Sequence, residues 1–217
     1  MDDRTPSRSA ANQRTPALNI IWNVPNVLTT ARLVLSLFLF VFLTVHWYLT
    51  SLVLFAIAAG TDWIDGFWAR RYGQITQLGR VLDPFADKII ICGAFIFLAA
   101  VPRPFGQWLP ASAIAPWMAV VVVAREMLVT ALRSFFEEGG VDCSAKWAGK
   151  WKMVFQCLAA GFSLYRLTYF DPGLANWTET PPQWLTVSLH ALVWAAIVLT
   201  VYSGWGYVQA ALRMLRK

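Results

Sequence analysis

Long apolar stretches without a single Asp, Glu, Lys or Arg dominate the pattern of this chain. They cover residues 33–60, 104–124 and 180–212. A helix that crosses the hydrocarbon core of a bilayer needs about 20 apolar residues. Each stretch is long enough for one span, and the first and third are longer. The pattern therefore predicts an all-α membrane protein.

Prolines, glycines and polar turns divide these stretches into six predicted transmembrane helices. The expected helices are 26–48, 50–71, 78–101, 110–137, 146–168 and 183–213. Residues 1–19 are polar and lack the apolar core of a secretory signal, so we expect a disordered N-terminal tail. The six-helix membrane catalytic domain is expected to occupy residues 20–217.

Composition and charge support the membrane assignment. The chain is 58% hydrophobic and only 14% charged, which is outside the usual soluble range. If the N-terminus is cytoplasmic and the helices alternate, every Lys and Arg except Arg103 and Arg166 falls on the inner side, as the positive-inside rule requires. The net charge of +6 is then a feature of topology, and nucleic acid is not an expected partner.

Four aspartates interrupt the apolar pattern of the second and third predicted helices. Asp62 and Asp65 share one helical stripe, and Asp83 and Asp87 share a stripe on the next helix. An ionised carboxylate within a membrane segment costs at least a few kcal/mol, so the cluster needs a compensating partner. A short turn near Tyr72 would make the helices antiparallel neighbours, with the four carboxylates converging at the cytoplasmic end.

Oxygen-only ligands, without nearby His or Cys, favour hard cations such as Mg²⁺ or Mn²⁺. Two such ions between carboxylates are a recurrent arrangement in phosphoryl transfer. Gly66, Ala69 and Gly79 would leave a groove for a phosphate-linked ligand, or would serve close helix packing. Arg70 would bind a diphosphate, or would act as a positive-inside anchor.

The spacing D-x2-D-G-x2-A-R-x8-G-x3-D-x3-D, from Asp62 to Asp87, resembles the signature of the CDP-alcohol phosphotransferases. The resemblance implies a six-helix bundle, a homodimer, and an active site at the cytoplasmic membrane surface. It also implies two metal ions on the four aspartates, with Asp87 as the general base. The implied CDP-lipid-binding residues are Val24, Pro25, Asn26, Val27, Gly66, Ala69, Arg70, Thr76 and Gly79.

Three further segments are similar to one branch of this family, the phosphatidylglycerophosphate synthases. They are residues 23–32, 124–137 and 149–156. The resemblance implies CDP-diacylglycerol and glycerol 3-phosphate as substrates, and a bacterial inner or cell membrane as the location. Leu37 and Met153 depart from the branch, where proline and threonine are common. Met153 lies beside the expected acceptor pocket and so bears on the choice of acceptor.

Basic residues on the fourth and fifth predicted helices offer a site for a second anionic substrate. Arg125 and Arg133 are eight residues apart and share a helix face, while Lys150 and Lys152 begin the next helix. All four are expected near inner helix ends, where they would bind the phosphate of glycerol 3-phosphate. The alternative is positive-inside anchoring, with glutamates as ion-pair partners.

The mechanism expected from these residues is direct transfer of the phosphatidyl group, with release of CMP. Three other interpretations stay open. One of them, a structural membrane protein, leaves the four clustered aspartates unexplained. A synthase of the same family would use inositol phosphate, serine, or phosphatidylglycerol to give cardiolipin. A divalent-cation transporter would also hold intramembrane aspartates, although such transport sites usually lie near the midplane.

Overall fold

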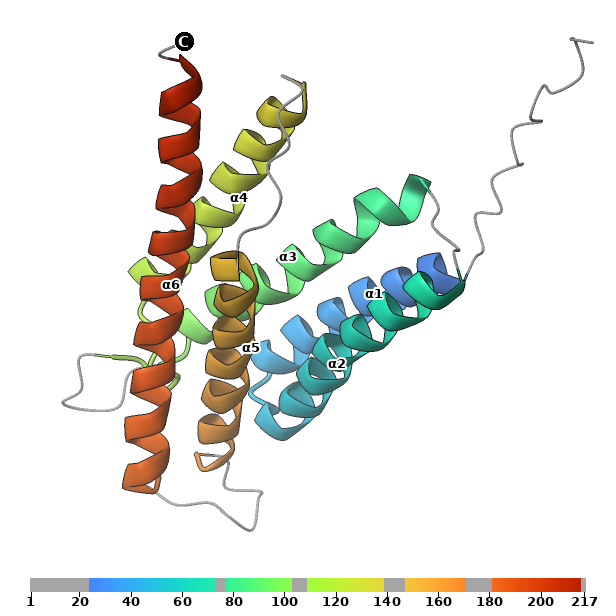
Figure 1. The fold of residues 1–217 in the computed structure, drawn as a ribbon. Helices are drawn as coiled ribbons and strands as arrows, with labels where there is room; N and C mark the ends of the chain where they lie inside the picture. Colours follow the sequence, from blue (N-terminus) through green and yellow to red (C-terminus); the bar gives the residue numbers. More distant parts are fainter. Residues whose placement is uncertain (1–23, 73–76, 103–108, 139–146, 171–180, 216–217) are drawn as a thin grey trace, which may run out of the picture.

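The computed structural model describes residues 24–72, 77–102, 109–138, 147–170 and 181–215, and its regular structure there is entirely helical. All six predicted helices are present (Figure 1). They are α1 (Val24–Thr44), α2 (Tyr48–Tyr72), α3 (Gln77–Ala99), α4 (Pro116–Glu138), α5 (Trp147–Thr168) and α6 (Gln183–Leu215).

Helix α5 joins the two halves of the bundle, because it contacts α2, α3 and α6. On one side, α1 packs against both α2 and α3. On the other side, α4 packs against α3 and α6. Figure 1 shows α1 beside α2, and α5 beside α6, with α3 leading from the first pair toward α4. The motif helices α2 and α3 are thus packed against the helices that carry the predicted acceptor residues.

Small residues bring the helices close together in the core. Ala58, Ala94, Ala159 and Ala196 are fully buried, one each on α2, α3, α5 and α6. Small side chains allow close backbone approach in membrane bundles. Many large apolar side chains point outward, including Leu37 and Val187, which are 63% and 68% exposed. An apolar outer surface of this kind suits contact with lipid rather than water.

Among the residues that the structure describes, two helices are long and apolar enough to cross a membrane, over Val27–Thr44 of α1 and Gln183–Arg213 of α6. Helices α3, α4 and α5 carry charged residues within their length, so their composition alone identifies them less clearly as membrane spans. The crossing of the membrane by all six helices stays a prediction.

Helix α4 begins at Pro116, six residues later than the predicted start at residue 110. The intervening residues are buried and, apart from Ser112, apolar, and they form a turn instead of helix. The backbone of Ala113 is left-handed, with a φ of 60°, and its N–H donates to the carbonyl of Pro110 over 2.8 Å. Proline favours the first turn of a helix, where its missing N–H costs nothing. This explains the later start at Pro116.

The end of α1 also differs from the prediction, which extended the helix to residue 48. His46 has a φ of 62°, and the N–H of Trp47 donates to the carbonyl of Phe42 over 2.9 Å. A left-handed residue with such a returning hydrogen bond is a common way for a helix to end. The turn at His46 therefore separates α1 from α2, which begins at Tyr48.

The connection between α3 and α4 is fastened to α5 by polar side chains. Ser112 donates to the carbonyl of Leu98 over 2.6 Å. Arg166 of α5 donates to the carbonyl of Ala111, and Ser163 donates to the carbonyl of Ser112. All of these groups belong to buried residues, where an unpaired carbonyl would be costly. The contacts fix the end of the bundle remote from the aspartate motif.

Gly93 gives a test of the packing between α1 and α3. A Cβ atom there would lie 2.1 Å from the Phe40 ring, which is stacked on Phe97 with ring centres 5.0 Å apart. We expect Gly93→Ala to destabilise the protein by about 1–3 kcal/mol through overpacking. Thermal unfolding of the purified protein measures this, at about 2–4 °C in Tm per kcal/mol.

Gly60→Ala is the matched control, because a Cβ atom at Gly60 meets nothing within 4 Å. Alanine is favoured over glycine in a helix by about 1 kcal/mol, so this variant should match or exceed the wild-type Tm. Equal Tm values for the two variants would contradict the packing described for Gly93.

Candidate active site

The backbone places the four motif aspartates on two helices that contact each other. Asp62 and Asp65 lie near the end of α2, and Asp83 and Asp87 lie in the first half of α3. Only the side chain of Asp87 belongs to the described part of the chain. The other predicted residues whose side chains lie outside it are Val24, Pro25, Asn26, Gly66, Ala69, Arg70, Thr76 and Gly79. Val27 is described and is exposed.

Asp87 forms an ion pair with a residue of α1. Nη1 of Arg32 donates to Oδ1 of Asp87 over 2.8 Å. The Arg32 side chain is only 2% exposed, whereas that of Asp87 is 26% exposed. A charge-assisted contact of this length is strong and directional. Arg32 therefore orients a carboxylate that is still accessible from outside the bundle.

Arg125, Glu126 and Lys152 form a second polar group, called here the charged cluster. Nη1 of Arg125 lies 3.2 Å from Oε1 of Glu126, and Nζ of Lys152 donates to the same oxygen. All three side chains are at most 12% exposed. Two of the predicted acceptor residues, Arg125 and Lys152, are thus brought together across α4 and α5.

Helix α6 contributes to this region through a polar stripe that the sequence analysis did not use. Nη2 of Arg125 donates to Oγ of Ser203 over 2.9 Å. Thr200 accepts a hydrogen bond of 2.9 Å from Nε2 of Gln156 on α5. Thr200 and Ser203, with Tyr207, follow an i, i+3, i+7 spacing, which is one face of a helix. That spacing, within an otherwise apolar helix, is the signal that could have identified them.

Gly204 lets the Arg125 side chain reach across α6. A Cβ atom at Gly204 would lie 3.1 Å from Cγ of Arg125. The absence of a side chain there leaves a path for the arginine stem. The position of the Arg125 guanidinium therefore depends on residues of two helices, α4 and α6.

The charged cluster lies on helices that pack against the helix that carries Asp87. Arg125 and Glu126 belong to α4 and Lys152 belongs to α5, and both helices contact α3.

The other two predicted acceptor residues occupy different surroundings. Arg133 lies on the same face of α4 as Arg125, since its Nη2 donates to the Tyr207 hydroxyl over 3.3 Å. Lys150 is exposed, whereas Lys152 is buried. Residues two apart on a helix do not face the same side. Lys150 is therefore not brought into the charged cluster.

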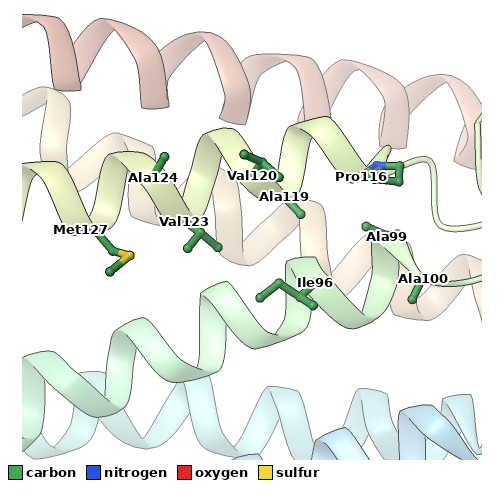
Figure 2. A pocket seen from close by; sticks show the side chains of 9 residues that line it. All are labelled: Ile96, Ala99, Ala100, Pro116, Ala119, Val120, Val123, Ala124 and Met127. Carbon is green, nitrogen blue, oxygen red and sulfur yellow. The ribbon is translucent and has the colours of Figure 1, made fainter.

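Two cavities adjoin this region. One, of about 470 Å³, lies between the start of α5 and α6, and its lining includes Ser203 and Tyr207. The other, of about 570 Å³, lies between α3 and α4 and is almost entirely apolar. Figure 2 shows that α3 and α4 diverge from their joined ends, with Ala124 and Met127 toward the wider part. Ser203 and Tyr207, which accept hydrogen bonds from Arg125 and Arg133, thus also line the first cavity.

The donor chemistry of the motif suits hard divalent cations. Asp87 offers carboxylate oxygen on α3, and the backbone brings the other three aspartates onto the adjoining parts of α2 and α3. Magnesium and manganese prefer oxygen ligands. Within the described residues no three His, Cys, Asp or Glu side chains gather, and the side chains of Asp62, Asp65 and Asp83 lie outside the described part of the chain.

Comparison with known proteins agrees with the sequence motif. A model of the family described as CDP-alcohol phosphatidyltransferase matches residues 22–204, and this chain belongs to that family. The match extends beyond the motif segments and includes most of α6.

Two relatives are named CDP-diacylglycerol–glycerol-3-phosphate 3-phosphatidyltransferase. The chain is 34% identical over 195 residues to the protein from Salmonella choleraesuis strain SC-B67, covering 88% of this chain and 95% of the relative. It is 33% identical, with the same coverage, to the protein from Escherichia coli strain K12.

Proposed function

We propose that this protein transfers the phosphatidyl group of CDP-diacylglycerol to sn-glycerol 3-phosphate, which yields phosphatidylglycerophosphate and CMP. The observation that carries this assignment is the similarity, along nearly their whole length, to relatives of that name. The charged cluster supports it, because Arg125 and Lys152 place two buried cations on helices that pack against the motif helix α3. A phosphorylated acceptor requires such cations, whereas an uncharged alcohol does not.

Asp62, Asp65, Asp83 and Asp87 would hold two Mg²⁺ or Mn²⁺ ions. When bound, such ions supply positive charge that neutralises the diphosphate and the departing CMP. Arg70, eight residues after Asp62, would pair with the same diphosphate. The residues at the start of α1, together with Gly66, Ala69, Thr76 and Gly79, would line the CDP-lipid site.

Asp87 would act as the general base. Its carboxylate accepts the proton of the acceptor hydroxyl, and the hydroxyl oxygen attacks the phosphorus that carries diacylglycerol. A new P–O bond forms as the bond from this phosphorus to the CMP oxygen breaks, and the bonding electrons leave with CMP. Arg32 orients the carboxylate for this step through their 2.8 Å contact. No covalent enzyme intermediate is required.

Arg125 and Lys152 would bind the phosphate of glycerol 3-phosphate, and Arg133 would contribute from the same face of α4. Cations held away from the aspartates can bind the acceptor without displacing the metal ions. The side chain of Lys150 is exposed, so it would act on the acceptor phosphate mainly through the long-range electrostatic field of its charge. The 470 Å³ cavity is lined by Ser203 and Tyr207, the residues that accept hydrogen bonds from Arg125 and Arg133.

The arrangement in the membrane follows from the same assignment. Residues 20–217 would form one catalytic domain of six spans, with the N-terminus and the active site on the cytoplasmic side of a bacterial inner or cell membrane. The polar residues 1–19 would be a separate tail. The family resemblance supports a homodimer.

Acceptor profiling tests the proposed function. Purified protein is incubated with CDP-diacylglycerol, Mg²⁺ and one acceptor at a time: glycerol 3-phosphate, serine, inositol phosphate or phosphatidylglycerol. We expect CMP release and a phosphatidylglycerophosphate product only with glycerol 3-phosphate. Excess EDTA should stop the reaction, because the proposed site depends on divalent cations, and added Mg²⁺ or Mn²⁺ should restore it.

Faster CMP release with another acceptor would identify that acceptor, instead of glycerol 3-phosphate, as the substrate. Full activity after removal of all metal would exclude the metal model. Uptake of labelled Mn²⁺ into proteoliposomes, without CMP release, would favour a transporter instead.

A further inference from the structure

One oxygen atom holds both cations of the charged cluster. Oε1 of Glu126 accepts from Nη1 of Arg125 and from Nζ of Lys152. Nη2 of Arg125 is fixed at its other side by Ser203, over 2.9 Å. Three helices thus determine where the two cations lie, and Glu126 is the residue they share.

The charges of the cluster do not balance. It contains two cationic side chains and one carboxylate, and all three are nearly buried. A buried charge without a counter-charge is costly, so an ion pair that served only stability would be better matched. The surplus positive charge suits an anionic ligand.

Donors remain available for such a ligand. An ammonium group has three N–H donors and a guanidinium has five, and the contacts with Glu126 and Ser203 use few of them. Within the described part of the chain, the Nε atom of Arg125 is buried without a hydrogen-bond partner.

We propose that Glu126 is a positioning residue for the acceptor: it fixes the directions of the Lys152 ammonium and the Arg125 guanidinium, so that both donate to one phosphate group. The inference rests on the proposed function and adds a residue to it. Glu126 itself does not touch the substrate. Its role is geometric, because small misplacements of binding groups strongly weaken their effect.

Two substitutions of Glu126 distinguish a role in positioning the cations from a role in balancing their charge. Glu126→Gln keeps the length of the side chain and an Oε1 acceptor, but removes the charge. Glu126→Asp keeps the charge, but it shortens the side chain by one methylene group and so moves the carboxylate oxygen away from both cations. If Glu126 positions the cations, length matters more than charge. The KM for glycerol 3-phosphate should rise about tenfold in Glu126→Asp, and should stay within about threefold of wild type in Glu126→Gln.

A different result is expected if Glu126 only offsets charge. Glu126→Asp would then have the acceptor KM of wild type, and only Glu126→Gln would change it, downward, because a competing anion is removed. A wild-type acceptor KM in Glu126→Asp would overturn the positioning role. The KM for CDP-diacylglycerol should change less than twofold in both variants, since the contacts that the structure describes for the Glu126 carboxylate are with the acceptor cations Arg125 and Lys152.

Ser163→Ala serves as the structural control. It removes the buried hydrogen bond to the carbonyl of Ser112, on the same helix as Lys152, without touching the charged cluster. We expect a Tm lower by about 2–4 °C with unchanged KM values. A change in acceptor KM equal to that of Glu126→Asp would show that loosening of α5 explains both, and would overturn the inference.

The same assays distinguish this inference from the proposed function. A wild-type protein that does not use glycerol 3-phosphate would overturn the proposed function. An active wild type, with unchanged acceptor KM in both Glu126 variants, would overturn the role of Glu126 alone.

Discussion

Asp87→Asn is expected to lower kcat for phosphatidyl transfer by at least about a hundredfold, and by up to ten-thousandfold, the range typical of a general base. The amide keeps the size of the side chain and an oxygen that can accept from Arg32, but it has no basicity. CDP-diacylglycerol should still bind, because three carboxylates remain for metal. Turnover against Mn²⁺ concentration, together with binding of the nucleotide lipid, measures both effects.

Asp62→Asn is the matched variant on α2. Asp62 is proposed as a metal ligand only, so a higher Mn²⁺ concentration should recover part of its activity. Asp87→Asn should not recover in this way. If added metal rescues both variants equally, Asp87 is a ligand like the others and the base is a different group.

Lys152→Met should raise the KM for glycerol 3-phosphate by about ten- to a hundredfold, since a charge-assisted hydrogen bond contributes about 1.5–3 kcal/mol. Methionine retains the apolar stem, which packs in the buried site, and removes only the ammonium group. The KM for CDP-diacylglycerol should change far less. Initial-rate measurements with each substrate varied in turn give both values.

Lys150→Met is the comparison, because it makes the same substitution on the exposed side of the same helix turn. Its effect on the acceptor KM should be several-fold smaller. Equal effects in the two variants would indicate that the basic residues act through general charge rather than through the buried position of Lys152.

The helices of this protein were predictable because long apolar stretches end at strong breaking signals. The start of α4 was not predictable, because residues 110–115 are as apolar as the helix that follows. Their turn depends on the left-handed backbone of Ala113 and on contacts with Arg166, which lies 55 residues away from Ala111. Tertiary contacts, rather than local composition, decide the structure of that segment.

The candidate site, like the fold, was predictable from the sequence only in part. The spacing of the aspartates identified the motif helices, and helical spacing placed Arg125 and Arg133 on one face, as observed in their contacts with α6. The ion pair between Arg32 and Asp87 joins residues 55 positions apart, so no local pattern predicts it. Lys150 and Lys152 looked equivalent in sequence, and only packing distinguishes the buried residue from the exposed one.

The contacts of Arg166 and Ser163 with the α3–α4 connection also constrain the order of assembly. During translation, α3 and α4 are synthesised before α5. The carbonyls of Ala111 and Ser112 therefore receive no hydrogen bond from Arg166 and Ser163 until α5 has been made. Each buried carbonyl without a partner costs about 1–3 kcal/mol. A nascent chain that ends at Glu138 therefore holds an incomplete hairpin, and synthesis of α5 locks the helix that carries Asp87 into place.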